Sequence, residues 1–314
     1  MARLLLVRFG LVAVTLFVIS FAIFVVTMVL PGDVATQILG QGATPDNVAA
    51  VRHQLGLDQP WPLRYVEWVG GAVHGDLGDS LVQRRPISEI IGRRIGNSIM
   101  LASFTFLVAI PAAVAVGIWA GVKRNSLGDR AASMLSLAAI SLPEFVTGVL
   151  LIMIFSTTLG WLPSSSIVEA GTSPLTRPQI MVLPALTLTG VMFAYIMRMT
   201  RANVIEVLDT NYVRSAVLKG LPMRRVLWRH VLPNAMLPTI SVIMLNTGWL
   251  LGGLIIVENV FSYPGLGRLL LTSIQTRDTP LLQALALLIA ATYAGANLIA
   301  DLAYAWLNPR VRFA

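Results

Sequence analysis

The sequence predicts an all-α integral membrane protein with six transmembrane helices, and two observations carry this prediction. The first is composition, because the 314 residues are 56% hydrophobic and only 12% charged, unlike a soluble domain. The second is the spacing of the charges, which leaves apolar stretches near the roughly 20 residues that cross a bilayer as a helix. The uncharged stretches are 9–30, 95–122, 131–143, 145–168, 179–197, 234–257 and 279–300.

The number of predicted spans depends on the first apolar stretch and on the interruption at Glu144. The stretch 9–30 is longer than the apolar core of a signal peptide, and the LPGDVATQ around its end offers no small-x-small cleavage site. We therefore expect a retained first span. The stretches 131–143 and 145–168 are separated by Glu144 alone. If Glu144 interrupts one span rather than ending it, the total is six.

Basic residues predict the orientation of the spans. Lys and Arg are enriched in short cytoplasmic loops, and here they gather before the first span, after the second and fourth spans, and after the sixth. We therefore expect both termini in the cytoplasm. The net charge of +8 then mostly reflects topology, and we expect no nucleic acid partner. The residues are Arg3, Arg8, Lys123, Arg124, Arg130, Arg198, Arg201, Arg214, Lys219, Arg224, Arg225, Arg229, Arg310 and Arg312.

These spans divide the chain into three regions. Residues 1–30 hold the N-terminal segment and the first transmembrane helix, 31–94 form an external region, and 95–314 form a core of five transmembrane helices. In the external region, TPDNVAAVRHQLG predicts a short helix that is capped near Thr44 or Asp46 and ends at Gly56.

Aromatic residues follow in the external region with the spacing of one helix face, at Trp61, Tyr65 and Trp68. They fit either an aromatic belt at the membrane surface or a contact with an external docking protein. The next motif, PISEIIGRRIGNS, predicts an amphipathic helix that begins near Pro86 and leads into the second span.

Residue types that carry catalysis or metal binding are scarce in the sequence. It contains no cysteine, and its histidines, His53, His74 and His230, lie far apart without an H-E-x-x-H pattern. Neither lysine, Lys123 or Lys219, follows a glycine, so the sequence has no phosphate-binding G-K-[ST] loop. We expect no catalytic residue, no bound cofactor and no metal site in this chain.

Three acidic residues lie within or near the predicted spans, where a charge is costly. Glu258 and Asp301 are near span ends, where interfacial water or a helix-end hydrogen bond would satisfy them. Glu144 follows Pro143 well inside the third span. It either lines a water-filled path or bonds a neighbouring helix, so Glu144 and Pro143 are candidates for a path through the membrane.

The segment 211–238, NYVRSAVLKGLPMRRVLWRHVLPNAMLP, is basic and lies between two apolar spans. It predicts a short helix, a bend at Gly220, and a second helix that starts near Pro222 and ends at Pro233. The first helix has a stripe of apolar or small residues at Val213, Ala216, Val217 and Gly220. The second has a stripe at Met223, Val226, Leu227 and His230.

Three interpretations fit such a basic helix pair. A DNA-reading helix-turn-helix is disfavoured because both ends are tethered to membrane spans. A hairpin that binds anionic lipid remains open. The favoured interpretation is a docking element for a cytoplasmic protein.

This segment resembles the cytoplasmic coupling loop of ABC importer permeases of the dipeptide, oligopeptide and nickel branch. Their signature is E-A-A, three residues, G, nine residues and I-x-L-P. Here Arg214 to Ala216 stand at E-A-A, Gly220 matches the glycine, His230 stands at the isoleucine, and Leu232 precedes Pro233. The glutamate is missing, which leaves open whether Arg214 takes its part.

Other motifs extend the resemblance, to the B-type subunit, over nearly the whole chain. They are PGD, LGLDQP, GDLGDS, SLPEFVTG, VFSYPGLGRLL and NLIADLAYAWLNPRVR, in family order and spacing. The resemblance implies a type I ABC importer permease arrangement in a bacterial plasma membrane, with a coupling loop at about 201–236 that inserts into a partner ATPase. The coupling residues it implies are Tyr212, Arg214, Ala216, Lys219, Gly220 and Leu221.

The resemblance also implies the partners of the chain: a second homologous permease subunit, two ABC ATPase subunits that bind ATP and Mg²⁺, and an external substrate-binding protein. The expected contacts with the binding protein are Trp61, Trp68, Tyr263 and Gly265. Di- or oligopeptides are the leading solutes, with nickel chelates, glutathione and oligosaccharides as alternatives. Rival interpretations are a proton-coupled secondary transporter that uses Glu144 and a membrane scaffold or signalling subunit.

Overall fold

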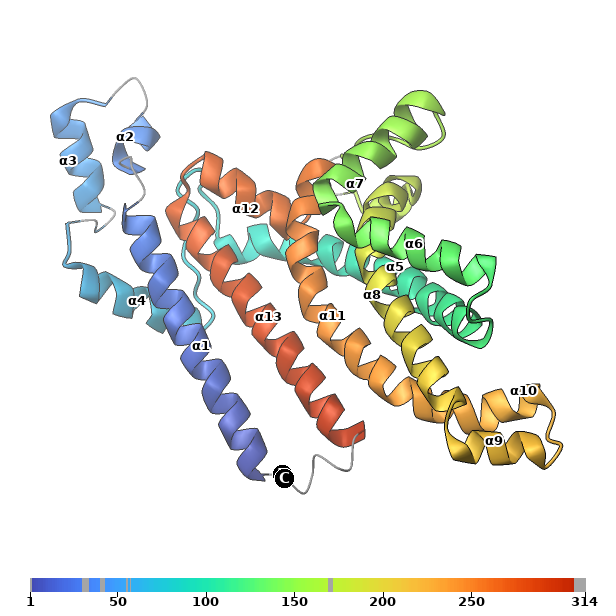
Figure 1. The fold of residues 1–314 in the computed structure, drawn as a ribbon. Coiled ribbons are helices and arrows are strands. Elements are labelled where there is room, and N and C mark those ends of the chain that lie inside the picture. Colours follow the sequence, from blue (N-terminus) through green and yellow to red (C-terminus); the bar gives the residue numbers. More distant parts are fainter. Residues whose placement is uncertain are drawn as a thin grey trace. The chain divides into compact units, whose positions relative to one another are not determined.

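The computed structural model describes residues 2–29, 34–39, 43–54, 56, 58–168 and 172–307. Within these residues every regular element is a helix, as the ribbon in Figure 1 shows. The all-α prediction is therefore confirmed. The expected PGD motif at 31–33 and the basic residues Arg310 and Arg312 lie outside the described residues.

Among the described residues, five helices or helical runs are long and apolar enough to cross a membrane. The spans expected on either side of the charged loops are thus present. They are α1 (Ala2–Val29), α5 (Ile87–Val122), α8 (Gln179–Leu208), α11 (Leu232–Val260) together with the short helices before it, and α13 (Thr279–Leu307).

The sixth candidate span is a bent pair of helices. Helix α6 (Leu127–Ser141) and helix α7 (Glu144–Leu151), which continues as a π-helical segment (Ile152–Thr158), meet at an angle of 110°. The bend falls where the sequence demands it, because Leu142 precedes Pro143 and adopts the extended conformation (ψ 131°) that such a residue prefers. The chain has six spans if this pair counts as one.

The chain forms two compact units. The first comprises residues 1–98 and 264–295. It contains α1, the first turns of α5, most of α13 and four shorter helices. The shorter helices are α2 (Val34–Leu39), α3 (Pro45–Gln54), α4 (Trp61–Val73) and α12 (Leu266–Gln275). Helix α3 confirms the short helix expected between Thr44 and Gly56, and Gly56 has the left-handed φ of +63°.

The core of the first unit joins the start of α5 to α12 and α13. Its buried residues are Ile87, Ile90, Ile91, Leu269, Leu281, Ala284 and Leu285. Helix α4 is attached to α1 through aromatic side chains, with the Tyr65 ring 5.4 Å from that of Phe24 and its hydroxyl 2.9 Å from Ser20 Oγ. The aromatic face expected at 61–68 therefore packs against another helix of the same unit.

The second unit comprises residues 99–263 and 296–314, and α8 is its central helix. Helix α8 is the most deeply buried of the candidate spans. In its most apolar stretch 67% of the residues are buried, compared with at most 28% in the corresponding stretches of the other long helices. Helices α11, α6 and α7 pack on α8. A short 3₁₀ helix (Pro174–Thr176) precedes it, and two short helices follow it, α9 (Asn211–Leu218) and α10 (Met223–Val226).

Small residues bring α5 close to α8 within this unit. A Cβ at Gly117 would lie 2.7 Å from the Met197 carbonyl oxygen, and one at Gly121 would lie 2.8 Å from the Val204 side chain. Glycines four positions apart let membrane helices approach at backbone distance. The close approach fixes the second half of α5 against the helix that leads to α9.

Candidate functional site

The basic segment, Asn211–Val231, is built from α9, a tight bend, α10 and a π-helical segment (Leu227–Val231) that runs into α11. Gly220 has φ +77°, its N–H donates to the Val217 carbonyl oxygen (2.9 Å), and the Leu221 N–H donates to that of Ala216 (3.3 Å). These two bonds form a Schellman motif, which ends a helix on a left-handed glycine. The bend predicted at Gly220 is confirmed.

The segment rests on an apolar base within the second unit. Val213 of α9 and Val226 of α10 are at most 2% exposed, so each helix of the pair turns at least one side chain inward. The buried base consists of Val204, Val213, Ala216, Val226, Val231, Leu232 and Ala235. Because these residues come from α8, α9, α10 and α11, the segment is packed as one body with the spans on both sides of it. Figure 1 shows α9 and α10 as a hairpin at the ends of α8 and α11.

The structure shows how much of each predicted stripe is buried, and it contradicts the prediction for Pro233. Val217 and Met223, which belong to the predicted stripes, are 44% and 51% exposed, because these short helices bury only a narrow face. Pro233 does not end the second helix. The Leu232 N–H donates to the Leu227 carbonyl oxygen five residues back, and this wider π turn sets Pro233 in the first turn of α11, where a proline needs no N–H donor.

The exposed side chains of the basic segment include both apolar and basic residues. Leu218 is 81% exposed and Trp228 is 69% exposed, and Tyr212 is 44% exposed. The basic residues Arg214, Lys219, Arg224, Arg225 and Arg229 are also exposed. Contiguous exposed apolar surface with a polar rim marks interaction sites. The arrangement suits a partner that offers an apolar cleft bordered by acidic groups.

An ion pair that the sequence analysis did not single out ties the start of α6 to α8. Arg201 Nη2 lies 2.8 Å from Asp129 Oδ2, and the Asp129 side chain is only 2% exposed. Asp129 also accepts the Asn125 N–H (2.9 Å). The only signal available from sequence was an acidic and a basic residue at two span ends. This pair fixes α6 to α8 less than three turns before the basic segment.

Glu144 is the first residue of α7 and is 8% exposed. Its carboxylate lies against the bare backbone of Gly253 in α11, where an added Cβ would come within 2.8 Å of Oε2 and 2.9 Å of Oε1. Among the described residues Oε2 has no hydrogen-bond partner. Glycine at position 253 thus makes room for a buried carboxyl group that the surrounding helices leave partly unsatisfied.

Glu258, expected near the interface, is fully buried at the end of α11. The neighbouring Tyr263 lies in the turn after α11 and is also fully buried. Burial and the Glu258 carboxylate raise the pKa of the Tyr263 hydroxyl well above its usual range. Glu258 is therefore part of the packed core at this turn and is not hydrated at a surface.

The four residues expected to meet an external binding protein lie in different settings. Trp61 is 49% exposed, whereas Trp68 stacks on Phe24 of α1 with ring centroids 6.2 Å apart. Tyr263 and Gly265 are buried. In this structure Tyr263 packs in the apolar cluster of the second unit with Val257 and Phe261. The contact with a binding protein stays a prediction for all four residues.

Comparison with known proteins identifies the family. Residues 113–313 match the binding-protein-dependent transport system inner membrane component, and residues 1–102 match the N-terminal region of such membrane components. The chain therefore belongs to this family of permease subunits of ABC importers, in the peptide and nickel branch that the sequence resembles. It is a multi-pass protein of a bacterial plasma membrane, and its family works with ATPase, permease and substrate-binding partners.

Individual relatives are similar over almost their full length. The chain is 40% identical over 299 residues to the glutathione transport system permease protein GsiC of Escherichia coli strain K12, which covers 95% of each chain. Proteins of the same name from Shigella dysenteriae serotype 1 strain Sd197 and Salmonella choleraesuis strain SC-B67 match equally, at 40% identity over 95% of each chain.

Proposed function

We propose that this chain forms one half of the translocation path of an importer for short peptides, and that partner ATPases drive it through the basic segment. The proposed coupling role is supported by the way the basic segment packs against the neighbouring spans. Its buried face belongs to one apolar cluster with α8 and α11, while Leu218, close to the Gly220 bend, is 81% exposed. A push on the bend is therefore transmitted to both spans as a rigid-body movement.

ATP hydrolysis belongs to the partners in this proposal. The sequence has no G-K-[ST] loop, so the two ATPase subunits would bind ATP and Mg²⁺. Closure of the ATPase pair would press on Tyr212, Arg214, Ala216, Lys219, Gly220 and Leu221. Of these, the exposed residues make the contact, and Ala216, which is 7% exposed, keeps α9 seated on its base. Nucleotide would thereby bias a two-state equilibrium between inward-open and outward-open arrangements.

Glutathione, a tripeptide, is the first solute to test. The proposal is supported by the relatives named as glutathione permeases over 95% of the chain and by the resemblance to dipeptide and oligopeptide permeases. We place Glu144 and Pro143 in the path. A carboxyl group in a membrane-spanning region that is 8% exposed and has an oxygen without a partner among the described residues suits transient contact with a solute ammonium group.

The test is uptake of labelled glutathione, a dipeptide and an oligopeptide into proteoliposomes that hold the complete complex, with binding protein outside and ATP inside. Leu218→Glu places a charge on the exposed face of α9, and we expect it to lower ATP-driven uptake at least about tenfold, because apolar contact with the ATPase is lost. Leu127→Glu is the matched control. Leu127 is 84% exposed at the start of α6, and this variant should transport normally.

Three outcomes would contradict the proposal in different ways. Equal uptake by the Leu218→Glu and Leu127→Glu complexes would exclude the basic segment as the coupling element. Uptake that needs no ATPase and collapses with the proton gradient would favour a proton-coupled transporter. Failure of all three peptides, while the binding protein still stimulates ATP hydrolysis, would leave the coupling intact and exclude the solute class.

A further inference from the structure

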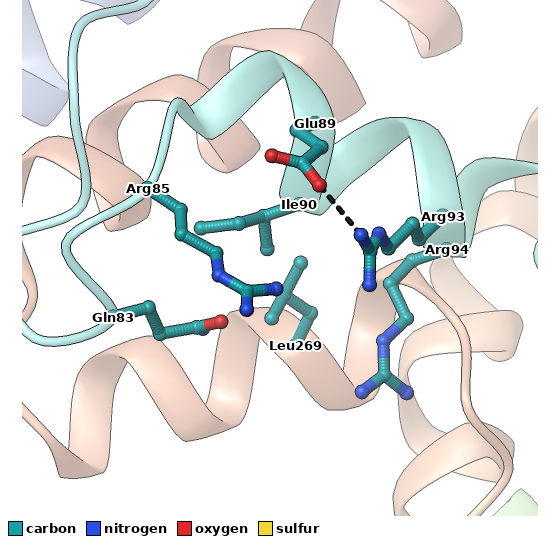
Figure 2. A pocket seen from close by; sticks show the side chains of 7 residues that line it. All are labelled: Gln83, Arg85, Glu89, Ile90, Arg93, Arg94 and Leu269. Atoms are coloured by element: carbon teal, nitrogen blue, oxygen red, sulfur yellow. Dashed lines mark hydrogen bonds and ion pairs between the residues drawn. The ribbon is translucent and has the colours of Figure 1, made fainter. Parts of the chain in front are cut away.

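A small pocket in the first unit gathers three arginines. Its volume is about 130 Å³, and Figure 2 shows the side chains that surround it. Arg85 extends from the loop before α5 toward Ile90 and Leu269, while Arg93 and Arg94 come from α5 itself. The lining residues are Gln83, Arg85, Glu89, Ile90, Arg93, Arg94 and Leu269. All of them belong to the same compact unit.

The pocket is positively charged above an apolar floor. Three guanidinium groups and one carboxylate line the pocket, and the carboxylate, Glu89, pairs with Arg93 at 2.5 Å. Both partners of this pair are exposed, at 65% and 46%, so the pair is worth at most about 1 kcal/mol and is easily exchanged. The floor consists of Ile90 and Leu269, which are 7% and 6% exposed. Guanidinium groups beside apolar surface bind carboxylates with forked, charge-assisted hydrogen bonds.

The loop that presents Arg85 is held rigid before any ligand arrives. Asp278, which is fully buried, accepts a hydrogen bond from the Ser80 hydroxyl and one from the Leu81 N–H (3.2 Å). The Ser80 N–H donates to the Arg85 carbonyl oxygen (3.0 Å), and Arg84 is held at φ 52°. A preorganised loop loses little conformational entropy on binding. Arg85 is thus displayed by a fixed scaffold.

Size indicates what the pocket accepts. Small-molecule sites usually have volumes of about 300–1,000 Å³, so about 130 Å³ is too small for a peptide solute. It accommodates one acidic side chain. The volume therefore fits a side chain of a partner protein better than a peptide solute.

The position of the pocket along the chain indicates which partner protein inserts this side chain. Helix α5 is a candidate span, and its last residue, Val122, packs against the base of the basic segment, which we propose faces the ATPases. The sequence predicts that residues 31–94, which include Arg85, form an external region, because the basic residues that mark the cytoplasmic face, Lys123 and Arg124, follow the other end of this span. The 36 residues of α5 make about 54 Å of helix at 1.5 Å per residue, whereas the bilayer with its headgroups is about 40–45 Å thick. Helix α5 is therefore long enough for some of its turns to extend beyond the lipid.

We propose that the arginine pocket (Arg85, Arg93 and Arg94 around Ile90 and Leu269) receives an acidic side chain of the external substrate-binding protein. This proposal rests on the proposed function, because it needs an importer that works with such a protein. The pocket would add to the contacts expected at Trp61, Trp68, Tyr263 and Gly265. Its charge also speeds association through long-range attraction that falls with ionic strength.

The experiment uses the complete complex in vesicles and titrates its solute-loaded binding protein against ATP hydrolysis. For Arg85→Gln we expect the half-saturating concentration of binding protein to rise about tenfold, the usual effect of losing one charge-assisted hydrogen bond. The dependence of this concentration on salt should weaken as well. Arg84→Asn is the matched control, since it removes a charge from the same loop outside the pocket and asparagine tolerates the φ of 52°.

A second variant covers the case in which Arg85→Gln fails to assemble. Arg93→Gln changes a side chain that is 65% exposed and should raise the same concentration severalfold. An Asp→Asn and Glu→Gln scan of the binding protein should contain one variant whose effect is not additive with that of Arg85→Gln, which identifies the inserted carboxylate. If the effect of every binding-protein variant is additive with that of Arg85→Gln, the proposal is overturned.

Three further outcomes would decide against it. If Arg85→Gln and Arg93→Gln both titrate like the wild type while binding protein still stimulates hydrolysis, the pocket is wrong and the proposed function stands. If binding protein never stimulates the wild-type complex, the proposed function itself fails. If the effect of Arg85→Gln disappears in vesicles of neutral phosphatidylcholine and needs phosphatidylglycerol, an anionic lipid headgroup occupies the pocket.

Discussion

Asp129 and Glu144 are both buried carboxylates on the bent pair α6–α7, and their surroundings are opposite. Asp129 has Arg201 within 2.8 Å and the Asn125 N–H within 2.9 Å. Glu144 lies against the Gly253 backbone, and its Oε2 has no partner among the described residues. A carboxylate with all its partners holds helices together, whereas one that lacks partners is retained at a cost and calls for a functional reason.

The largest effect is expected for Asp129→Ala. It leaves the Arg201 guanidinium, whose side chain is 28% exposed, without its carboxylate, and we expect a loss of about 2–4 kcal/mol in the free energy of unfolding. The measurement is denaturant unfolding of the purified chain in detergent. Asp209→Ala is the control, because it breaks an ion pair with Arg124 whose side chains are 59% and 53% exposed and should cost less than about 1 kcal/mol. Equal losses would show that burial does not distinguish the two pairs.

A middle-sized effect is expected from filling the space beside Glu144. Gly253→Ala would bring a methyl group within 2.9 Å of both carboxylate oxygens, so Glu144 must move, at about 1–2 kcal/mol. The control is Gly252→Ala, where no atom lies within 4 Å of the added Cβ and the higher helix propensity of alanine should stabilise by about 0.5–1 kcal/mol.

A double variant sharpens the same test. If the clash with Glu144 is the cause, Glu144→Ala should remove most of the penalty of Gly253→Ala, with a coupling of about 1 kcal/mol in a double-mutant cycle of unfolding free energies. Strict additivity of the two substitutions would mean that the carboxylate is not what opposes a side chain at position 253.

The smallest effect on stability is expected for Glu144→Gln, which keeps the shape of the side chain and breaks no ion pair with a described residue. We expect a change below about 1 kcal/mol in unfolding free energy. In the same protein the KM for glutathione uptake should rise severalfold, because an ammonium group would lose its carboxylate in the path. A stability loss as large as that of Asp129→Ala, with an unchanged KM, would make Glu144 a structural residue.

Local sequence was sufficient for features that depend on neighbouring residues only. The Gly220 bend was predictable because glycine alone adopts φ +77° without strain. The break at Pro143 was predictable because a proline disfavours a helical residue before it, although the angle of 110° was not. The aromatic face at 61–68 was predictable from spacing, but its contact with Phe24 of α1 required the fold.

The basic segment, too, has features that the local sequence predicts and features that depend on the fold. The sequence indicated a helix pair with apolar stripes, and Val213, Ala216 and Val226 of these stripes are buried. It could not indicate that Val217 and Met223 stay exposed, because the width of the buried face depends on α8 and α11. It also could not show that Pro233 continues the helix, since a π turn is a compromise between backbone bonding and packing.

Patterns of consecutive residues were enough to predict the membrane class, the approximate limits of the spans and the position of the basic segment, because bilayer thickness and helical period act on neighbours in the chain. The folded structure was needed to show that Asp129 pairs with Arg201, 72 positions away, that Tyr263 is a core residue, and that Arg85 and Leu269 share one pocket. Such contacts join residues far apart in the chain. They arise when helices pack, and no local pattern encodes which faces will meet.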